Sequence, residues 1–174
     1  MISSILGLFE ERHQQHFEKH GYVILGRLLS GSELAGLCRR ADDLMMGNVT
    51  IPGVTFQLDG DGKEYKLGPR TEGPSEHTLN YRRIDELHND PLYLAYMQHI
   101  VFRQLTRHYV GKNVSIFRSM FMNKPAKNGT ILPWHQDIGK GWGINTTPTT
   151  TVWTALDDVW SPARTQSPAP RSPR

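Results

Sequence analysis

The sequence predicts an α+β domain, with helices in its first part and strands in its last part. Up to residue 109, apolar side chains recur mainly at spacings of three and four, which is the period of an α-helix. From residue 114 onwards they recur at every second position, which is the period of a β-strand. Helices and strands that are segregated along the chain are typical of α+β domains, in which each layer buries its apolar face against another.

Two helices are expected near the N-terminus. The first runs from Leu8 to His20 and ends at Gly21, because glycine commonly follows the last helical turn. A short buried strand, Tyr22–Leu25, is expected next. Ser30 and Glu33 form a capping box that begins the second helix, and Gly47 ends it. The apolar stripe of this helix consists of Leu34, Leu37, Ala41, Leu44 and Met45.

The rest of the chain is expected to hold one more helix and three strands. Glycines and prolines between residues 48 and 78 predict an irregular region with one hairpin. Asp90 caps and Pro91 opens a third helix, which runs to Tyr109 and stops at Gly111. The strands are expected at 114–122, 131–137 and 149–157.

Composition favours a water-soluble, cytoplasmic protein. The 174 residues are 37% hydrophobic and 21% charged, and no window of about eighteen consecutive apolar residues is present, so no membrane span is expected. The N-terminus lacks the basic segment of a signal peptide. A single cysteine, Cys38, agrees with a reducing compartment and is interpreted as a small helix hydrophobe.

The positive charge of the chain lies in its C-terminal tail. Residues 159–174 contain four prolines, three serines and three arginines but no acid, which predicts a disordered tail after a domain at 1–158. Without the tail the formal charge falls from +3 to zero, so a nucleic-acid partner is not expected. The expected partner is a small-molecule substrate.

A candidate metal site lies at His135 and Asp137. In a strand, residues two positions apart point to the same side, so this imidazole and carboxylate can converge. A nitrogen and a hard oxygen on one face suit iron(II) of the 2-His-1-carboxylate type. A surface pair without metal explains the spacing equally well. Two other His-x-acid pairs do not suit a metal. The pair at His16 lies in a helical pattern, where residues two positions apart diverge, and in the pair at His88 the acid, Asp90, is better explained as a helix cap.

Three runs of residues carry a resemblance to a known family. They are Ser-Met-Phe-Met-Asn-Lys-Pro at 119–125, Pro-Trp-His-Gln-Asp at 133–137 and Thr-Val-Trp-Thr-Ala-Leu-Asp-Asp at 151–158. Together with Phe17–Leu25, they resemble the phytanoyl-CoA dioxygenase family of iron(II)/2-oxoglutarate oxygenases in order and spacing. The resemblance covers the chain from Phe17 to Asp158. It implies N-terminal helices packed on a jelly-roll, or double-stranded β-helix.

The resemblance also implies a reaction and the residues that support it. Iron(II) is held by His135, Asp137 and a later histidine, 2-oxoglutarate is the co-substrate, and ascorbate serves as a reductant. 2-Oxoglutarate becomes succinate and carbon dioxide while a C–H bond of a small or lipid-like metabolite is hydroxylated. Met120 and Trp153 match residues that lie along the co-substrate, although core filling explains both equally well. Arg82, with Arg83 beside it, falls where the family tends to place a basic residue near the co-substrate, although a paired surface arginine explains these residues equally well.

Trp134 is expected beside the metal, or on the wall of the substrate pocket. The third iron ligand and the arginine that binds the distal carboxylate of 2-oxoglutarate have no counterpart, because no histidine follows His135 and the sequence departs from the family after Asp158. We therefore expect a chain truncated before the distal His and Arg, with the second half of the jelly-roll missing. Half a jelly-roll leaves strand edges unpaired, so self-association through these edges is also expected.

Two alternatives stay open at this point. One is replacement of the third ligand by another histidine, although the spacing favours none of the candidates His77, His88, His99 and His108. The other is a catalytically inactive, truncated relative that binds metal weakly or binds a partner chain. A structural zinc protein would need a closed set of Cys and His ligands, which the sequence lacks.

Overall fold

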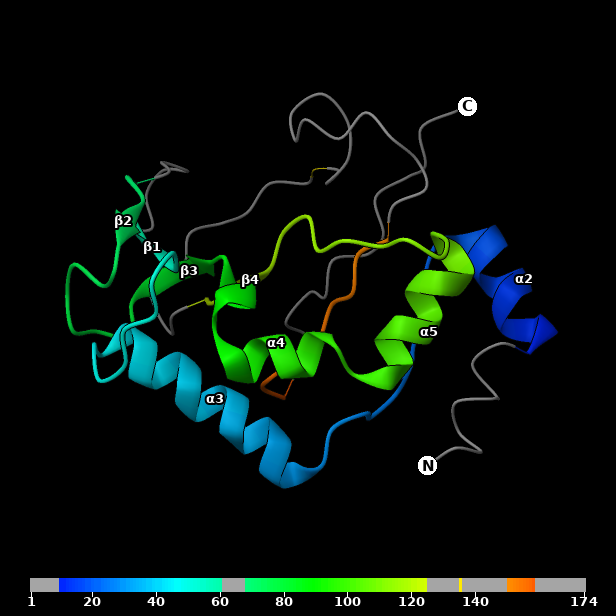
Figure 1. The fold of residues 1–174 in the computed structure, drawn as a ribbon, viewed down its shortest axis with the longest axis horizontal. Helices are drawn as coiled ribbons and strands as arrows, with labels where there is room; N and C mark the ends of the chain where they lie inside the picture. The colour runs from blue at the N-terminus through cyan, green and yellow to red at the C-terminus, as the bar shows by residue number, and fades with distance from the viewer. Residues whose placement is uncertain (1–9, 61–67, 125–134, 136–149, 159–174) are drawn as a thin grey trace. The chain divides into compact units, whose positions relative to one another are not determined.

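A computed structural model describes residues 10–60, 68–124, 135 and 150–158 (Figure 1). These residues form four α-helices and one four-stranded antiparallel sheet, which confirms the mixture of helices and strands. In chain order the elements are α2 (Glu11–His20), α3 (Gly31–Met45), β1 (Thr55–Leu58), β2 (Thr71–Glu72), β3 (Tyr81–Asp85), the 3-10 helix η2 (Leu87–Asn89), α4 (Pro91–Met97), α5 (Ile100–Tyr109) and β4 (Met120–Met122). The expected tail at 159–174 lies outside the described residues.

The chain divides into two compact units, Met1–Gly36 and Leu37–Arg174. In the first unit, α2 ends as expected at Gly21, which is left-handed (φ 80°) and donates its backbone N–H to the Phe17 carbonyl. The strand expected at Tyr22–Leu25 is wrong. This segment pairs with no strand in the part of the chain that the structure describes, and the Ile24 side chain is 78% exposed.

The capping box of α3 is confirmed. The Ser30 hydroxyl accepts from the Glu33 N–H at 3.3 Å, and the Ser30 N–H donates to the Glu33 carboxylate at 2.8 Å. This reciprocal pair satisfies two backbone groups that the first turn leaves free. The stripe is also confirmed in the second unit, where the four buried residues are Leu37, Ala41, Leu44 and Met45. Leu34 is half-buried, and Gly47 follows the helix with a φ of 73°.

The single helix expected from Pro91 to Tyr109 is wrong, because the structure has two helices there. Helix α4 ends at Met97, and α5 begins at Ile100. Between them His99 has an extended backbone (φ −54°, ψ 140°), and its Nδ1 accepts from the Val101 N–H at 3.3 Å. A side-chain acceptor at this position competes with the helical hydrogen bond and begins a new helix instead.

The sheet has the order β2-β1-β3-β4, with every pair antiparallel. Strands β1 and β2 form the hairpin expected between residues 48 and 78. Strand β3, which sequence reasoning did not predict, pairs with β1 on one edge and with β4 on the other. Strand β4 covers only the last part of the expected strand 114–122, and Val114, Ile116 and Phe117 before it are exposed.

The last two expected strands have different outcomes. Of the strand at 131–137, only His135 is described, and it lies in no regular element. The strand at 149–157 is wrong, because described residues 150–157 form none. Hydrogen bonds tie this segment to helices instead: the Cys38 thiol donates to the Leu156 carbonyl at 3.6 Å, and the hydroxyls of Tyr96 and Thr154 contact each other. The jelly-roll therefore stays a prediction.

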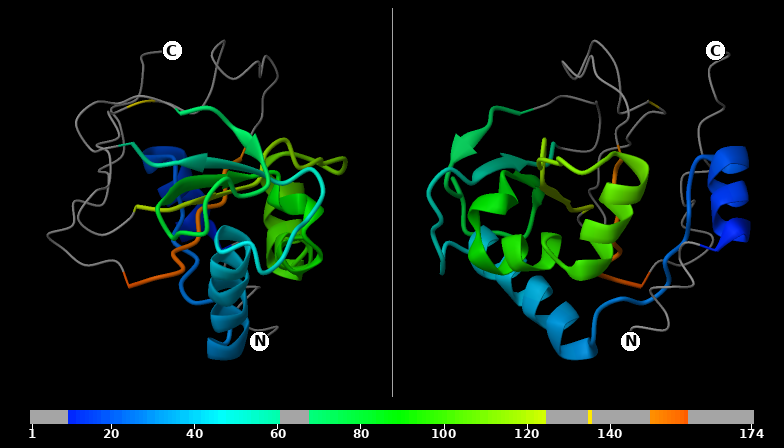
Figure 2. Two further views of the ribbon diagram at one scale, coloured as in Figure 1. Left: turned by 90° about the vertical axis from the view of Figure 1, so that its left-hand side faces the viewer. Right: turned by 45° about the vertical axis from the view of Figure 1, so that its right-hand side comes forward.

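The core of the second unit lies between one face of the sheet and three helices. Phe56, Tyr81 and Ile84 are buried on this face, with the rings of Phe56 and Tyr81 packed edge to face at 5.4 Å. Helices α4 and α5 lie on the same side of the sheet (Figure 2). Tyr93 of α4 connects to α3 by donating its hydroxyl to the Leu37 carbonyl at 2.9 Å. None of the described helices is long and apolar enough to cross a bilayer.

Asp90 begins α4 as expected from the sequence. Its Oδ1 accepts from the N–H groups of Leu92 at 2.8 Å and Tyr93 at 3.2 Å. The carboxylate is fully buried, and its Oδ2 lies 3.7 Å from Nη1 of Arg40 on α3. Asp90 therefore satisfies the first turn of one helix and also attracts a cation on another.

Replacing Asp90 by Ala is expected to lower the free energy of unfolding by about 1–2 kcal/mol, because the first turn of α4 loses its acceptor. Asp90→Ser is the matched control, since serine caps well but carries no charge. Urea unfolding of both variants measures the difference. If Asp90→Ser is as destabilised as Asp90→Ala, the ion pair with Arg40 matters more than the cap.

Tyr93 predicts a loss of stability at alkaline pH. Burial, followed by nearby acidic groups, raises the pKa of its phenol above the ordinary value. The stability that Tyr93 contributes is therefore complete below pH about 10 and falls as the pH rises further. At neutral pH, Tyr93→Phe is expected to be less stable than the wild type by about 0.5–1.5 kcal/mol, because it lacks the hydrogen bond. Between pH 9 and 11, the free energy of unfolding of the variant is expected to fall less than that of the wild type. Parallel pH profiles from urea unfolding would contradict this account.

Candidate active site

The face of the sheet opposite the aromatic core carries polar and charged side chains. Residues paired directly across antiparallel strands share a face. The pairing places Glu72, Thr55, Asp85 and Met120 in one row across the four strands. Gln57, Arg83 and Met122 form the adjacent row across three of them. The two methionines of β4 thus continue a polar surface that β1 and β3 begin.

Asp85 is the most buried charge on this face, at 1% exposed. Its Oδ2 accepts a hydrogen bond from Nε of Arg83 at 2.7 Å, and Nε of Arg70 lies 3.7 Å from the same oxygen. Arg83 and Asp85 are two positions apart on β3, so their side chains leave the strand on one side. The neighbouring Gln57 is 3% exposed and donates its amide to the Gly68 carbonyl. Asp85 Oδ1 and Gln57 Oε1 are buried and make no hydrogen bond in the described part of the chain.

A second polar group lies where η2 meets the start of β4. The Ser119 hydroxyl accepts from the His88 N–H at 2.8 Å and lies 2.9 Å from Nδ1 of the same residue. Glu86 Oε2 is 3.6 Å from this Nδ1. In a Ser-His-acid catalytic triad the serine and the acid contact opposite nitrogens of the ring. Here both contact Nδ1, so the group holds η2 against residue 119 and does not form a triad.

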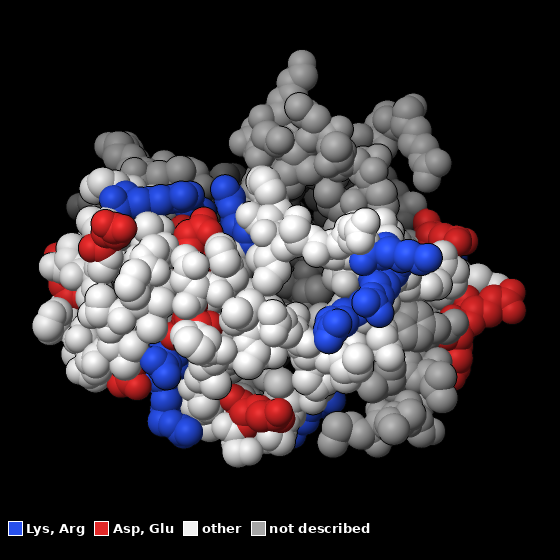
Figure 3. Space-filling model, viewed as in Figure 1, with Lys and Arg blue, Asp and Glu red and all other residues white. Residues whose placement is uncertain are grey.

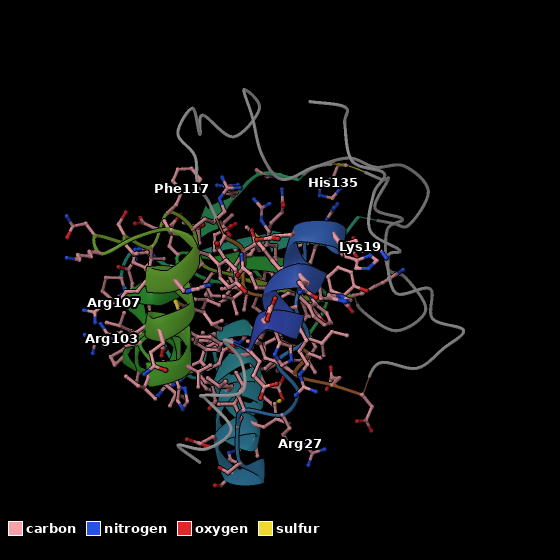
Figure 4. All side chains as sticks on the ribbon, turned by 90° about the vertical axis from the view of Figure 1, so that its right-hand side faces the viewer. Lys19, Arg27, Arg103, Arg107, Phe117 and His135 are labelled. Carbon is pink, nitrogen blue, oxygen red and sulfur yellow. The ribbon has the colours of Figure 1, made fainter. Side chains whose placement is uncertain are left out.

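The structure describes only one of the two predicted iron ligands. His135 itself lies in no regular element and has an exposed side chain, and Figure 4 labels it. Asp137 lies outside the described residues, as does Trp134. The convergence of His135 and Asp137 on one metal therefore stays a prediction.

The predicted co-substrate contacts lie in different surroundings. Met120 is half-buried in β4 and pairs with Asp85. Arg82 is 7% exposed and sits at the irregularity in the pairing of β1 with β3, whereas Arg83 pairs with Met122 beside Met120. The basic residue that shares the face of Met120 is therefore Arg83. A contact between Arg82 and the co-substrate stays a prediction.

Trp153 is 74% exposed, in the segment where the strand prediction failed. Two residues that follow it are held by helices: Thr154 contacts the Tyr96 hydroxyl, and the Leu156 carbonyl accepts from the Cys38 thiol. Burial raises the pKa of the Tyr96 phenol, and the hydrogen bond with Thr154 partly offsets this rise. Burial also raises the pKa of the Cys38 thiol, with smaller contributions from Asp157 and Asp42. The thiol therefore stays protonated at neutral pH, as expected of a packing residue.

The four histidines considered as a replacement third ligand all have other contacts. His77 packs against Gly47, and His88 contacts Ser119. His99 caps α5, and His108 stacks edge to face with Tyr109 at 4.7 Å. Within the described ranges, no three His, Cys, Asp or Glu side chains come close enough together to hold a metal ion.

Sequence reasoning missed the charged cluster of Arg70, Arg83 and Asp85. Arg70 comes from the segment before β2, 13 residues from Arg83 and 15 from Asp85, so no local pattern connects them. The sequence Tyr-Arg-Arg-Ile-Asp at 81–85 gave a weak signal for this strand, because Tyr81 and Ile84 flank the two arginines. In the structure these five residues form β3, which is buried at both ends. Over the sheet and α4, acidic and basic side chains are interspersed on the surface (Figure 3).

Comparison with known proteins identifies the family. The sequence model of the phytanoyl-CoA dioxygenase family (PhyH) matches residues 17–161, which is well over half of the chain. The match spans the described sheet, the helices of the second unit and the positions of His135 and Asp137. Searches of curated proteins and of solved structures gave no match. The chain belongs to the phytanoyl-CoA dioxygenase family.

Proposed function

We propose that this protein is an iron(II)- and 2-oxoglutarate-dependent dioxygenase that hydroxylates a small or lipid-like metabolite. The observation that carries the proposal is the family match over residues 17–161, which includes the His135-Gln136-Asp137 run. Family membership supports an oxygenase activity in general. The use of iron(II), the use of 2-oxoglutarate and the class of substrate are our proposals.

The chemistry of the proposed ligands fits the metal. His135 supplies an imidazole nitrogen and Asp137 a hard carboxylate oxygen, the two donor types that iron(II) oxygenases of the 2-His-1-carboxylate kind use. When bound, iron(II) would supply the oxidative chemistry, coupled to decarboxylation of 2-oxoglutarate. The His135 side chain is exposed.

The chain's own residues would bind and orient the organic molecules. Half-buried Met120 would offer the co-substrate an apolar wall, with Trp153 as a second apolar contact. Arg82 is proposed to balance the negative charge of the co-substrate, and Trp134 to exclude water at the substrate pocket. Each role is proposed from the resemblance of these positions to the family's motifs.

A second candidate function is metal binding without turnover. It is favoured by the sequence after Asp158, which lacks the run in which the family carries its third iron ligand. A metal ion with two protein ligands instead of three is bound more weakly and with a less fixed geometry.

The two candidates are tested by iron binding and by succinate formation. Anaerobic calorimetry of the full chain with iron(II) and 2-oxoglutarate measures binding, and aerobic incubation with ascorbate measures succinate. His135→Ala and Asp137→Ala are each expected to weaken iron binding by more than about tenfold, because each removes a direct ligand. His108→Ala is the matched control, since His108 is also exposed but lies on α5.

Succinate that depends on His135 and Asp137 supports the dioxygenase. Iron binding that depends on both residues, without succinate, supports the second candidate. If His135→Ala binds iron(II) as tightly as His108→Ala, neither candidate holds and the metal reading of this run is wrong.

A further inference from the structure

We propose that His16 and His20 form a metal-binding site in the last turns of α2, for a divalent ion that prefers nitrogen ligands, with zinc(II) as the type ion. Neither residue belongs to the proposed iron site, and His16 lies before the family match, which begins at residue 17. The site therefore stands or falls independently of the proposed function.

Helix α2 places the two imidazoles side by side. His16 and His20 are four positions apart, so they lie about one turn from each other on the same side of the helix. Their ring centroids are 4.5 Å apart, and the ring planes are inclined by 36°. Two nitrogens that each bind one zinc ion at about 2.0–2.1 Å lie at most about 4 Å apart. A small rotation of two rings at this separation directs one nitrogen of each ring to a common ion.

The chain after α2 folds back and packs a third ring against the pair. Gly21 ends the helix in the left-handed conformation (φ 80°), and its N–H donates to the Phe17 carbonyl at 2.7 Å. The ring of Tyr22 meets the His16 ring edge to face at 4.9 Å and lies 6.2 Å from the His20 ring. These contacts restrict the rotamers of both imidazoles, so less side-chain entropy is lost when an ion binds.

Exposure and electrostatics both suit a cation. The His20 side chain is exposed and that of His16 is half-buried, so the pair lies at the surface. His20 is also the last residue of α2, where the aligned peptide dipoles place partial negative charge. The charged residues between the two histidines, Glu18 and Lys19, have opposite signs, so their charges balance.

The site is open, with two protein ligands. His13 lies one turn before His16 on α2, but no three His, Cys, Asp or Glu side chains in the described ranges come close enough together to hold a metal ion. Water would complete the coordination, so we expect an exchangeable ion that is bound more weakly than at a closed zinc site. Imidazole suits zinc, copper and nickel, whereas magnesium and calcium prefer oxygen ligands.

The test is calorimetric titration of the full chain with zinc(II), in a His135→Ala parent that lacks the histidine of the proposed iron site. His16→Ala and His20→Ala are each expected to weaken zinc binding by at least about tenfold, because each removes one of two direct ligands. His13→Ala is the matched control, since it also removes a histidine from α2 but leaves the pair intact, and its affinity is expected to equal that of the parent. Magnesium(II) is expected to show no binding that depends on the pair.

A rearranged variant tests the spacing of the pair. Glu18→His combined with His20→Ala keeps the number of histidines in α2 but places the second one two positions after His16, where helical side chains do not face each other. This variant is expected to bind zinc(II) as weakly as His20→Ala alone. Binding as tight as that of the parent would show that the number of histidines matters and not their geometry, and would overturn the site.

Hydrogen exchange locates the ion on the helix. An ion that is bound only by the folded helix opposes its opening, so the amides of α2 are expected to exchange about tenfold more slowly at a zinc concentration ten times the Kd. His16→Ala is expected to abolish this slowing, and alanine favours the helix, so the variant keeps α2. A parent that binds no zinc(II), equal affinities of the parent and both single variants, or an equal loss in His13→Ala would each overturn the proposal.

Discussion

The second unit depends on the pairing of strand β3 along both of its edges. Hydrogen bonds to β1 and β4 fix the orientation of every side chain of β3, so Tyr81 and Ile84 enter the core while Arg83 and Asp85 leave on the other face. Both Ile84 and Tyr81 are fully buried, and Asp85 is nearly so. A strand with an apolar and a charged face, each buried, tolerates no shift of one residue, because such a shift would exchange the two faces.

Local signals in the sequence predicted local structure well. The capping box at Ser30, the glycine at position 21 and the cap at Asp90 all act within three or four residues, and all three are confirmed. The break before α5 was missed because His99 uses its side chain as a cap, a role that helical periodicity does not reveal. Strand β3 was missed because two adjacent arginines interrupt its alternation, while the pairing that buries them comes from residues far away in the chain.

The residues of the candidate site also fall into those that the sequence predicts and those that only the fold brings together. His135 and Asp137 come from a short motif and a family match, both of which the sequence contains. The cluster of Arg70, Arg83 and Asp85 comes from strand β3 and the segment before β2, so only the folded chain brings it together. In the segment around Trp153, by contrast, the sequence predicted a strand that the structure does not have. Its β-branched and aromatic residues favour a strand, but Tyr96 and Cys38 supply hydrogen-bonding partners from helices.

Glu86 joins β3 to η2 with a left-handed backbone (φ 61°, ψ 33°), a conformation that costs a residue with a side chain about 1 kcal/mol. The chain thereby changes direction within a single residue, directly after the charged end of β3. The bend sets the angle at which η2 leaves the sheet, and residues that accept a positive φ, such as glycine, asparagine and aspartate, would adopt it at a lower cost than glutamate. A valine or isoleucine there would demand a wider bend, and every element that follows would have to change its course.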